Sequence, residues 1–271
     1  MVDIIQRNNV SVTGCGDQTM IFAHGFGCNQ NVWLPVIQAL ESDFRCVLFD
    51  YVGAGNSDLS AYDKHKYATL DGYAKDVLDI CEALAIEAPV FVGHSVSAMI
   101  GVRAALLKPG YFSKMIFVSP SPYYINDGEY IGGMEESDLL DLLSMMDNNY
   151  LGWSSAIAPL VMGNADKPEL GEALTANFCS TDPNIAKEFA RVTFLSDSRP
   201  DLQKLEVPNF TLQCSDDMLA PLAVGNYIYK HTANNTLTIL EATGHCPHLS
   251  APQETIEAIK SYVSVPLMEY C

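Results

Sequence analysis

Residues 89–97 read Pro89-Val90-Phe91-Val92-Gly93-His94-Ser95-Val96-Ser97, and a helical pattern follows over residues 96–107. The apolar run 89–92 predicts a buried strand, so Ser95 lies at an abrupt change from strand to helix. In the pattern Gly-x-Ser-x-Gly such a turn, the nucleophile elbow, raises a serine hydroxyl above a sheet. Ser97 stands where the pattern has its second glycine, and we expect so small a residue to be tolerated. A serine that only caps a helix is the alternative; the flanking strand and helix favour the elbow.

The chain on both sides of this turn alternates short apolar runs with helical patterns. Strands followed by helices indicate right-handed crossovers and a mostly parallel sheet covered on both faces. Near Ile4 and Val10 we expect a hairpin that adds antiparallel edge strands. The predicted class is α/β, with strands at 19–23, 45–49, 89–92, 114–118, 209–213 and 237–240, and helices at 30–41, 70–85, 96–107, 219–231 and 253–263.

Residues 120–199 break this alternation, and we call them the lid. They contain no convincing strand but four helical patterns, at 135–147, 149–162, 168–179 and 183–195. Prolines and a glycine pair mark their starts. We therefore expect an all-helical insertion in a core made of 1–119 and 200–271, placed over the carboxyl edge of the sheet, where ligands bind.

A serine nucleophile needs a base, and the base needs an orienting carboxylate. Asp216 and Asp217 follow the strand at 209–213, and His245 follows the strand at 237–240. Both positions lie at the same sheet edge as Ser95, in the chain order Ser, Asp, His that this kind of site uses. The residues alone leave the choice between Asp216 and Asp217 open.

Negative charge that develops on a substrate carbonyl oxygen needs preorganised donors. The loop His24-Gly25-Phe26-Gly27 follows a predicted strand and offers the Phe26 N–H, while the Val96 N–H offers a second donor. A dinucleotide fingerprint is excluded, because no third glycine follows at the required spacing. The pair His245 and His248 is a poor metal site, so we expect no metal and no cofactor.

The charge balance excludes several classes of partner. The 271 residues include 33 acidic and 15 basic side chains, a net charge of −18. Such an excess disfavours nucleic acid and anionic membranes. Eight scattered cysteines without a Cys-x-x-Cys pair, and no secretory signal or long apolar run, indicate reduced thiols and a cytoplasmic protein.

These motifs resemble the α/β-hydrolase superfamily over essentially the whole chain. Within it the chain looks most like RsbQ-like bacterial stress-response regulators and, more distantly, the plant strigolactone and karrikin receptors. The matching segments are 26–28, 48–53 with Gly55 and 57–59, Tyr67 with 69–73, 91–96, Gly152-Trp153, 178–183, 212–214 and 244–248.

The resemblance implies an α/β-hydrolase fold with a four-helix lid. It implies a triad of Ser95, His245 and Asp217, the last chosen over Asp216 by its place four residues before Pro221, with oxyanion donors at Phe26 and Val96. It also implies an apolar pocket between lid and core. The lining we expect, beside Phe26, is His94, Tyr123, Leu142, Met146, Trp153, Ile157, Phe178, Phe194, Met218 and His248.

The predicted function is a serine hydrolase that cleaves a small hydrophobic ester or lactone through an acyl-enzyme, with a signalling role in stress response. The alternative is a small-molecule sensor with slow turnover that signals through a protein partner on the lid. A pure binding module is disfavoured, because it needs no complete triad. Epoxide hydrolases and dehalogenases are disfavoured as well, since they need a carboxylate at Ser95. The lid carries 13 acidic and 4 basic residues, which suggests an acidic outer face for such a partner.

Overall fold

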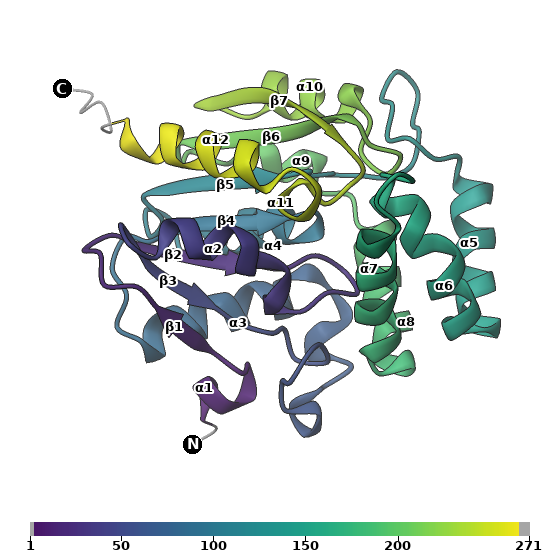
Figure 1. Ribbon diagram of the computed structural model, residues 1–271, viewed down its shortest axis with the longest axis horizontal. Coiled ribbons are helices and arrows are strands. Elements are labelled where there is room, and N and C mark those ends of the chain that lie inside the picture. Colours follow the sequence, from purple (N-terminus) through teal and green to yellow (C-terminus); the bar gives the residue numbers. More distant parts are fainter. Residues whose placement is uncertain (1–2, 266–271) are drawn as a thin grey trace.

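The computed structural model describes residues 3–265 and is organised around a seven-stranded sheet (Figure 1). The strand order is β1-β3-β2-β4-β5-β6-β7; β1 runs antiparallel to β3, and all other neighbours are parallel. The bounds are β1 Ser11–Thr13, β2 Thr19–Ala23, β3 Arg45–Leu48, β4 Val90–His94, β5 Lys114–Val118, β6 Asn209–Asp216 and β7 Asn235–Thr243.

The predicted α/β fold with a mostly parallel sheet is confirmed. All six predicted strands are present, and β6 and β7 extend further along the chain than their apolar runs. The central strands β2, β4 and β5 are buried at every residue, as a sheet covered on both faces requires.

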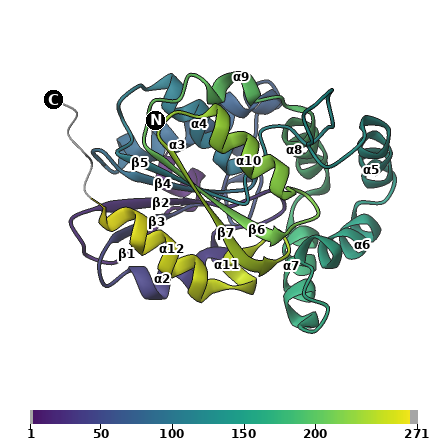
Figure 2. The same ribbon diagram turned by 90° about the horizontal axis from the view of Figure 1, so that it is seen from above.

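Helices cover both faces of this sheet (Figure 2). On one face lie α2 Leu34–Leu40, which continues the 3-10 turn Gln30–Trp33, and α11 and α12; on the other lie α3, α4, α9 and α10. The remaining bounds are α3 Leu70–Ala83, α4 Val96–Leu107, α9 Arg199–Leu202, α10 Leu222–His231, α11 Pro247–Ser250 and α12 Pro252–Ser264, with short 3-10 turns at Leu59–Ala61 and Lys66–Ala68.

The lid contains four helices between β5 and β6, beyond the carboxyl ends of the strands (Figure 1). Proline begins two of them, and the Asp182 side chain caps the last by accepting from the Asn184 and Ile185 N–H groups. The bounds are α5 Glu136–Asn148, α6 Tyr150–Met162, α7 Pro168–Ser180 and α8 Pro183–Leu195.

The N-terminal hairpin predicted near Ile4 is wrong. Residues Ile4–Arg7 form the short helix α1, because the Asp3 carboxylate caps the Ile5 and Gln6 N–H groups. The antiparallel edge strand is β1 instead, which begins just after Val10.

Helix α1 is fixed to the core by a buried ion pair. The guanidinium of Arg7 lies 3.0 Å from both Asp76 Oδ1 and Asp79 Oδ2. Asp76 is fully buried in α3 and also accepts from Lys66 and from the Tyr67 hydroxyl, whereas Asp79 is 39% exposed.

We predict that Asp76→Ala lowers the free energy of unfolding by about 3–5 kcal/mol, because it leaves buried donors without an acceptor. Asp79→Ala is the matched control: it also removes a partner of Arg7, but from an exposed position, and should cost less than about 1 kcal/mol. Urea denaturation measures both. Equal losses in the two variants would contradict this account of the α1 anchor.

Candidate active site

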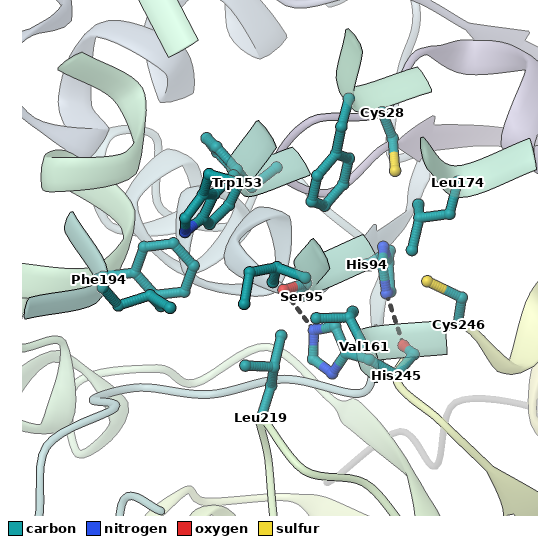
Figure 3. A pocket seen from close by; sticks show the side chains of 14 residues that line it. Cys28, His94, Ser95, Trp153, Val161, Leu174, Phe194, Leu219, His245 and Cys246 are labelled. Carbon is teal, nitrogen blue, oxygen red and sulfur yellow. Dashed lines mark hydrogen bonds between the residues drawn. The ribbon is translucent and has the colours of Figure 1, made fainter. Parts of the chain in front are cut away.

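Ser95 occupies a strained turn at the carboxyl end of β4. Its backbone has φ 57° and ψ −125°, a conformation that side-chain-bearing residues rarely adopt. The Ser95 N–H donates to the Val118 carbonyl of β5 at 2.9 Å, which fixes the turn to the neighbouring strand. The serine side chain is thereby directed into the space between sheet and lid (Figure 3).

The structure brings Ser95, His245 and Asp217 into one hydrogen-bonded chain. Ser95 Oγ lies 2.7 Å from His245 Nε2, and His245 Nδ1 lies 2.8 Å from Asp217 Oδ2. A carboxylate only accepts, so Nδ1 carries the proton and Nε2 is free to accept from the serine hydroxyl. All three side chains are buried.

The backbone around Asp217 explains why this aspartate, rather than Asp216, faces His245. Asp217 Oδ1 accepts from the Leu219 and Ala220 N–H groups at 2.9 and 3.1 Å, which holds the carboxylate inward. Asp216 is the last residue of β6, and its side chain is exposed.

The two expected oxyanion donors lie on either side of this chain. The Val96 N–H is the first of helix α4, where no intrahelical acceptor exists. The Phe26 N–H donates to no protein acceptor within the part of the chain that the structure describes. Both N–H groups are therefore free for a substrate oxygen.

The loop that carries Phe26 is packed from both sides. A Cβ on Gly25 would lie 2.5 Å from His94 Nδ1, and one on Gly27 would lie 2.5 Å from the Phe178 ring. The Phe26 ring itself contacts four aromatic rings of the lid, with centroid distances of 5.7 to 6.3 Å, from Trp153, Phe178, Phe189 and Phe194.

A small cavity of about 30 Å³ lies above Ser95 (Figure 3). Its lining is almost entirely apolar apart from Ser95 and two histidines. Of the residues expected to line it, the structure places there His94, Leu142, Trp153, Ile157, Phe178 and Phe194, together with Phe26; it adds Cys28, Val161, Leu174, Leu219 and Cys246.

Four residues expected in the pocket do not line this cavity. Met218 is 49% exposed, because Asp217 and Leu219 on either side of it face inward. The Tyr123 ring stacks with Tyr130 under the Arg199 guanidinium. Met146 is buried in α5 outside the cavity wall. His248 lies deeper, stacked on Trp33 with ring centroids 4.5 Å apart.

Tyr124 is a site residue that sequence reasoning missed in favour of its neighbour. Its hydroxyl lies 3.3 Å from Ser95 Oγ and, since the serine proton is directed to His245, it is the donor. Burial raises the pKa of Tyr124 to about 12, so the hydroxyl keeps its proton near neutral pH. The available signal was its position after β5, at the same sheet edge as Ser95.

Three buried histidines lie near the site in addition to His245. His94 Nε2 donates to the His245 carbonyl at 2.8 Å, and its ring lies 4.5 Å from that of His248. Burial holds the pKa of His94 well below its usual range and lowers the pKa of His248 to about 3. Burial also lowers the pKa of His24. All three are therefore neutral imidazoles.

Residues 20–258 match the family model described as "Alpha/beta hydrolase family". The chain belongs to the alpha/beta hydrolase family. With esterase-named relatives over almost its whole length, this alpha/beta hydrolase is an enzyme of the carboxylic ester hydrolase type.

Its relatives include plant receptors and a bacterial hydrolase. The karrikin insensitive 2 receptor CA of Petunia hybrida is 36% identical, over 95% of this chain and 96% of the receptor. The strigolactone esterase D14 of Arabidopsis thaliana is 36% identical, over 95% and 97%. The solved structure of olei00960, a hydrolase from Oleispira antarctica, has a TM-score of 0.95 at 39% identity and covers 97% of both chains.

Two searches of the described residues returned nothing. Within residues 3–265, no three metal-ligating side chains converge on a point. In the same part of the chain, no helix has the length and apolar character needed to cross a membrane.

The buried histidines predict a loss of stability in acid. As the pH falls from about 6.5 toward 3, the unfolded chain binds a proton at residue 248 that the folded chain refuses, so the free energy of unfolding decreases. We expect His248→Phe to reduce this slope by about 1.4 kcal/mol per pH unit. Urea denaturation at pH 6, 5 and 4 measures it, with the exposed His65→Gln as control; equal slopes in wild type and His248→Phe would contradict it.

Proposed function

We propose that this alpha/beta hydrolase cleaves a small hydrophobic ester or lactone through an acyl-enzyme on Ser95. The observation that carries the proposal is the continuous chain from Ser95 Oγ through His245 to Asp217, beside two free backbone donors. The apolar lining of the cavity above Ser95 supports a hydrophobic substrate.

Each group then has a role in the reaction. As Ser95 Oγ bonds to the carbonyl carbon, its proton passes to His245 Nε2 and the carbonyl electron pair moves to oxygen, where the Phe26 and Val96 N–H groups stabilise it. Collapse expels the alcohol oxygen, which takes the proton from Nε2. A water that gives its proton to Nε2 then releases the acid and restores Ser95. Asp217 holds the imidazole in the required tautomer throughout.

The size of the cavity favours the second candidate, a sensor with slow turnover. About 30 Å³ is room for roughly two water molecules, so a ligand must displace lid side chains to reach Ser95. That displacement reaches the base, because the His245 N–H donates to the Val161 carbonyl at the end of α6. The Asn164 side chain, just beyond α6, likewise donates to the Thr243 carbonyl.

The sensor form of the proposal is an RsbQ-like role in signalling, with residues 120–199 as the lid that a protein partner contacts. Exposed acidic residues on α5 and α7 support this partner surface: Glu136, Asp138, Asp141, Glu169 and Glu172. We also place the protein in the cytoplasm, since all seven cysteines among the described residues are free thiols.

We predict that Ser95→Ala lowers the hydrolysis of p-nitrophenyl acetate by about a thousandfold or more, because the nucleophile is removed. A fluorophosphonate should label the wild type on Ser95 and leave the variant unlabelled. Ser144→Ala, which removes an exposed serine of the lid, is the matched control and should behave as wild type. A label on another residue, or unchanged turnover in Ser95→Ala, would refute the proposed chemistry.

Slow turnover predicts that the acyl-enzyme accumulates. Mixing the protein with excess p-nitrophenyl acetate should release a burst of about one p-nitrophenol per protein before a slow linear phase. Intact mass spectrometry of the quenched protein should show the added acetyl group. Linear release without a burst, at rates typical of metabolic esterases, would favour a simple esterase over a sensor.

A further inference from the structure

Ser97, at the position where the elbow pattern has glycine, belongs to a buried polar network. It is fully buried, and its hydroxyl donates to the His24 carbonyl. Its Oγ also lies 3.0 Å from the Tyr51 hydroxyl. A serine hydroxyl has one proton, and that proton goes to the carbonyl; the Tyr51 hydroxyl is therefore the donor to Ser97.

The same accounting fixes the tautomer of His24. Nδ1 lies 2.9 Å from the Gly25 carbonyl and must donate to it, so Nε2 is unprotonated. Nε2 accordingly accepts the Tyr51 backbone N–H at 3.2 Å. Ser97 thus holds the main chain of His24, while Tyr51 holds both its ring and the Ser97 hydroxyl.

This network controls one particular peptide plane. The Gly25 carbonyl and the Phe26 N–H belong to the same peptide group, which is planar and trans, so they point in opposite directions. The His24 ring holds that carbonyl, and the Cys28 N–H donates to it as well, at 3.3 Å. Fixing the carbonyl on the core side turns the Phe26 N–H toward the space above Ser95.

We propose that Ser97 is a positioning residue, which orients the oxyanion-binding Phe26 N–H through the chain Ser97, His24 and the Gly25 carbonyl. The inference rests on the proposed acyl-transfer function. Ser97 touches no reacting atom. Its contribution is to hold the donor in place before the substrate arrives, which matters because an oxyanion donor acts only within a few tenths of an ångström of its ideal distance.

Ser97→Ala should lower kcat for p-nitrophenyl acetate about tenfold to a hundredfold and leave KM within about twofold, because the transition state rather than the bound ester needs the donor. Ser97→Gly, which restores the glycine of the pattern, should lose as much. Tyr51→Phe keeps the Ser97 bond to His24 and should lose less than either. Ser97→Thr, which retains the hydroxyl, should recover activity relative to Ser97→Ala.

A thionoester separates this role from a general loss of structure. Sulfur accepts hydrogen bonds weakly, so the thiono analogue of the same ester gains little from the oxyanion donors. In wild type the ester should react much faster than its thiono analogue, and in Ser97→Ala this ratio should fall by the same factor as kcat. A merely structural role would lower both rates equally and leave the ratio unchanged, which would overturn the inference.

Failure of the inference and failure of the proposed function are distinguishable. A wild type that hydrolyses no ester and leaves Ser95 unlabelled overturns the proposed function and this inference with it. An active wild type whose ester-to-thionoester ratio survives Ser97→Ala overturns the inference alone. If Ser97→Ala does not fold, Tyr51→Phe gives the same decision, since a smaller fall of the ratio is still required.

Discussion

The strained turn at Ser95 is the constraint on which the rest of the site depends. A positive φ at a residue with a side chain persists only where its surroundings hold it, and here the neighbours of Ser95 also hold everything else. His94, one residue before, donates to the His245 carbonyl and packs against Gly25. Ser97, two residues after, donates to the His24 carbonyl. One turn therefore sets the relative positions of nucleophile, base and oxyanion loop.

The lid adds a second level of control from above. Phe26 lies between the elbow and four aromatic rings of the lid, so the residue that supplies an oxyanion donor also senses how the lid is packed. The end of α6 contacts the His245 segment directly through the Val161 carbonyl. A ligand that opens the nearly filled cavity would disturb both donor and base, and this coupling is what an enzyme with a sensing role requires.

The sequence predicted the fold and the order of the site residues because both follow from periodicity. Apolar runs that alternate with helices specify a parallel sheet, and loops after its strands meet at one edge. It failed where neighbouring residues alternate in direction along an extended turn. Tyr124 faces Ser95 while Tyr123 faces away, and Leu219 faces the cavity while Met218 is exposed. Composition does not reveal that phase, and the role of the Ser97 hydroxyl became visible only with its two partners in place.

The crystal structure of the fluorophosphonate adduct tests the central claim most directly, because the phosphonyl oxygen occupies the place of the oxyanion. The account predicts phosphorus bonded to Ser95 Oγ, with that oxygen about 2.7–3.1 Å from both the Phe26 and Val96 nitrogens. It also predicts that Ser97 remains bonded to the His24 carbonyl. An adduct whose oxygen points away from these two N–H groups, or one formed on another residue, would contradict the account.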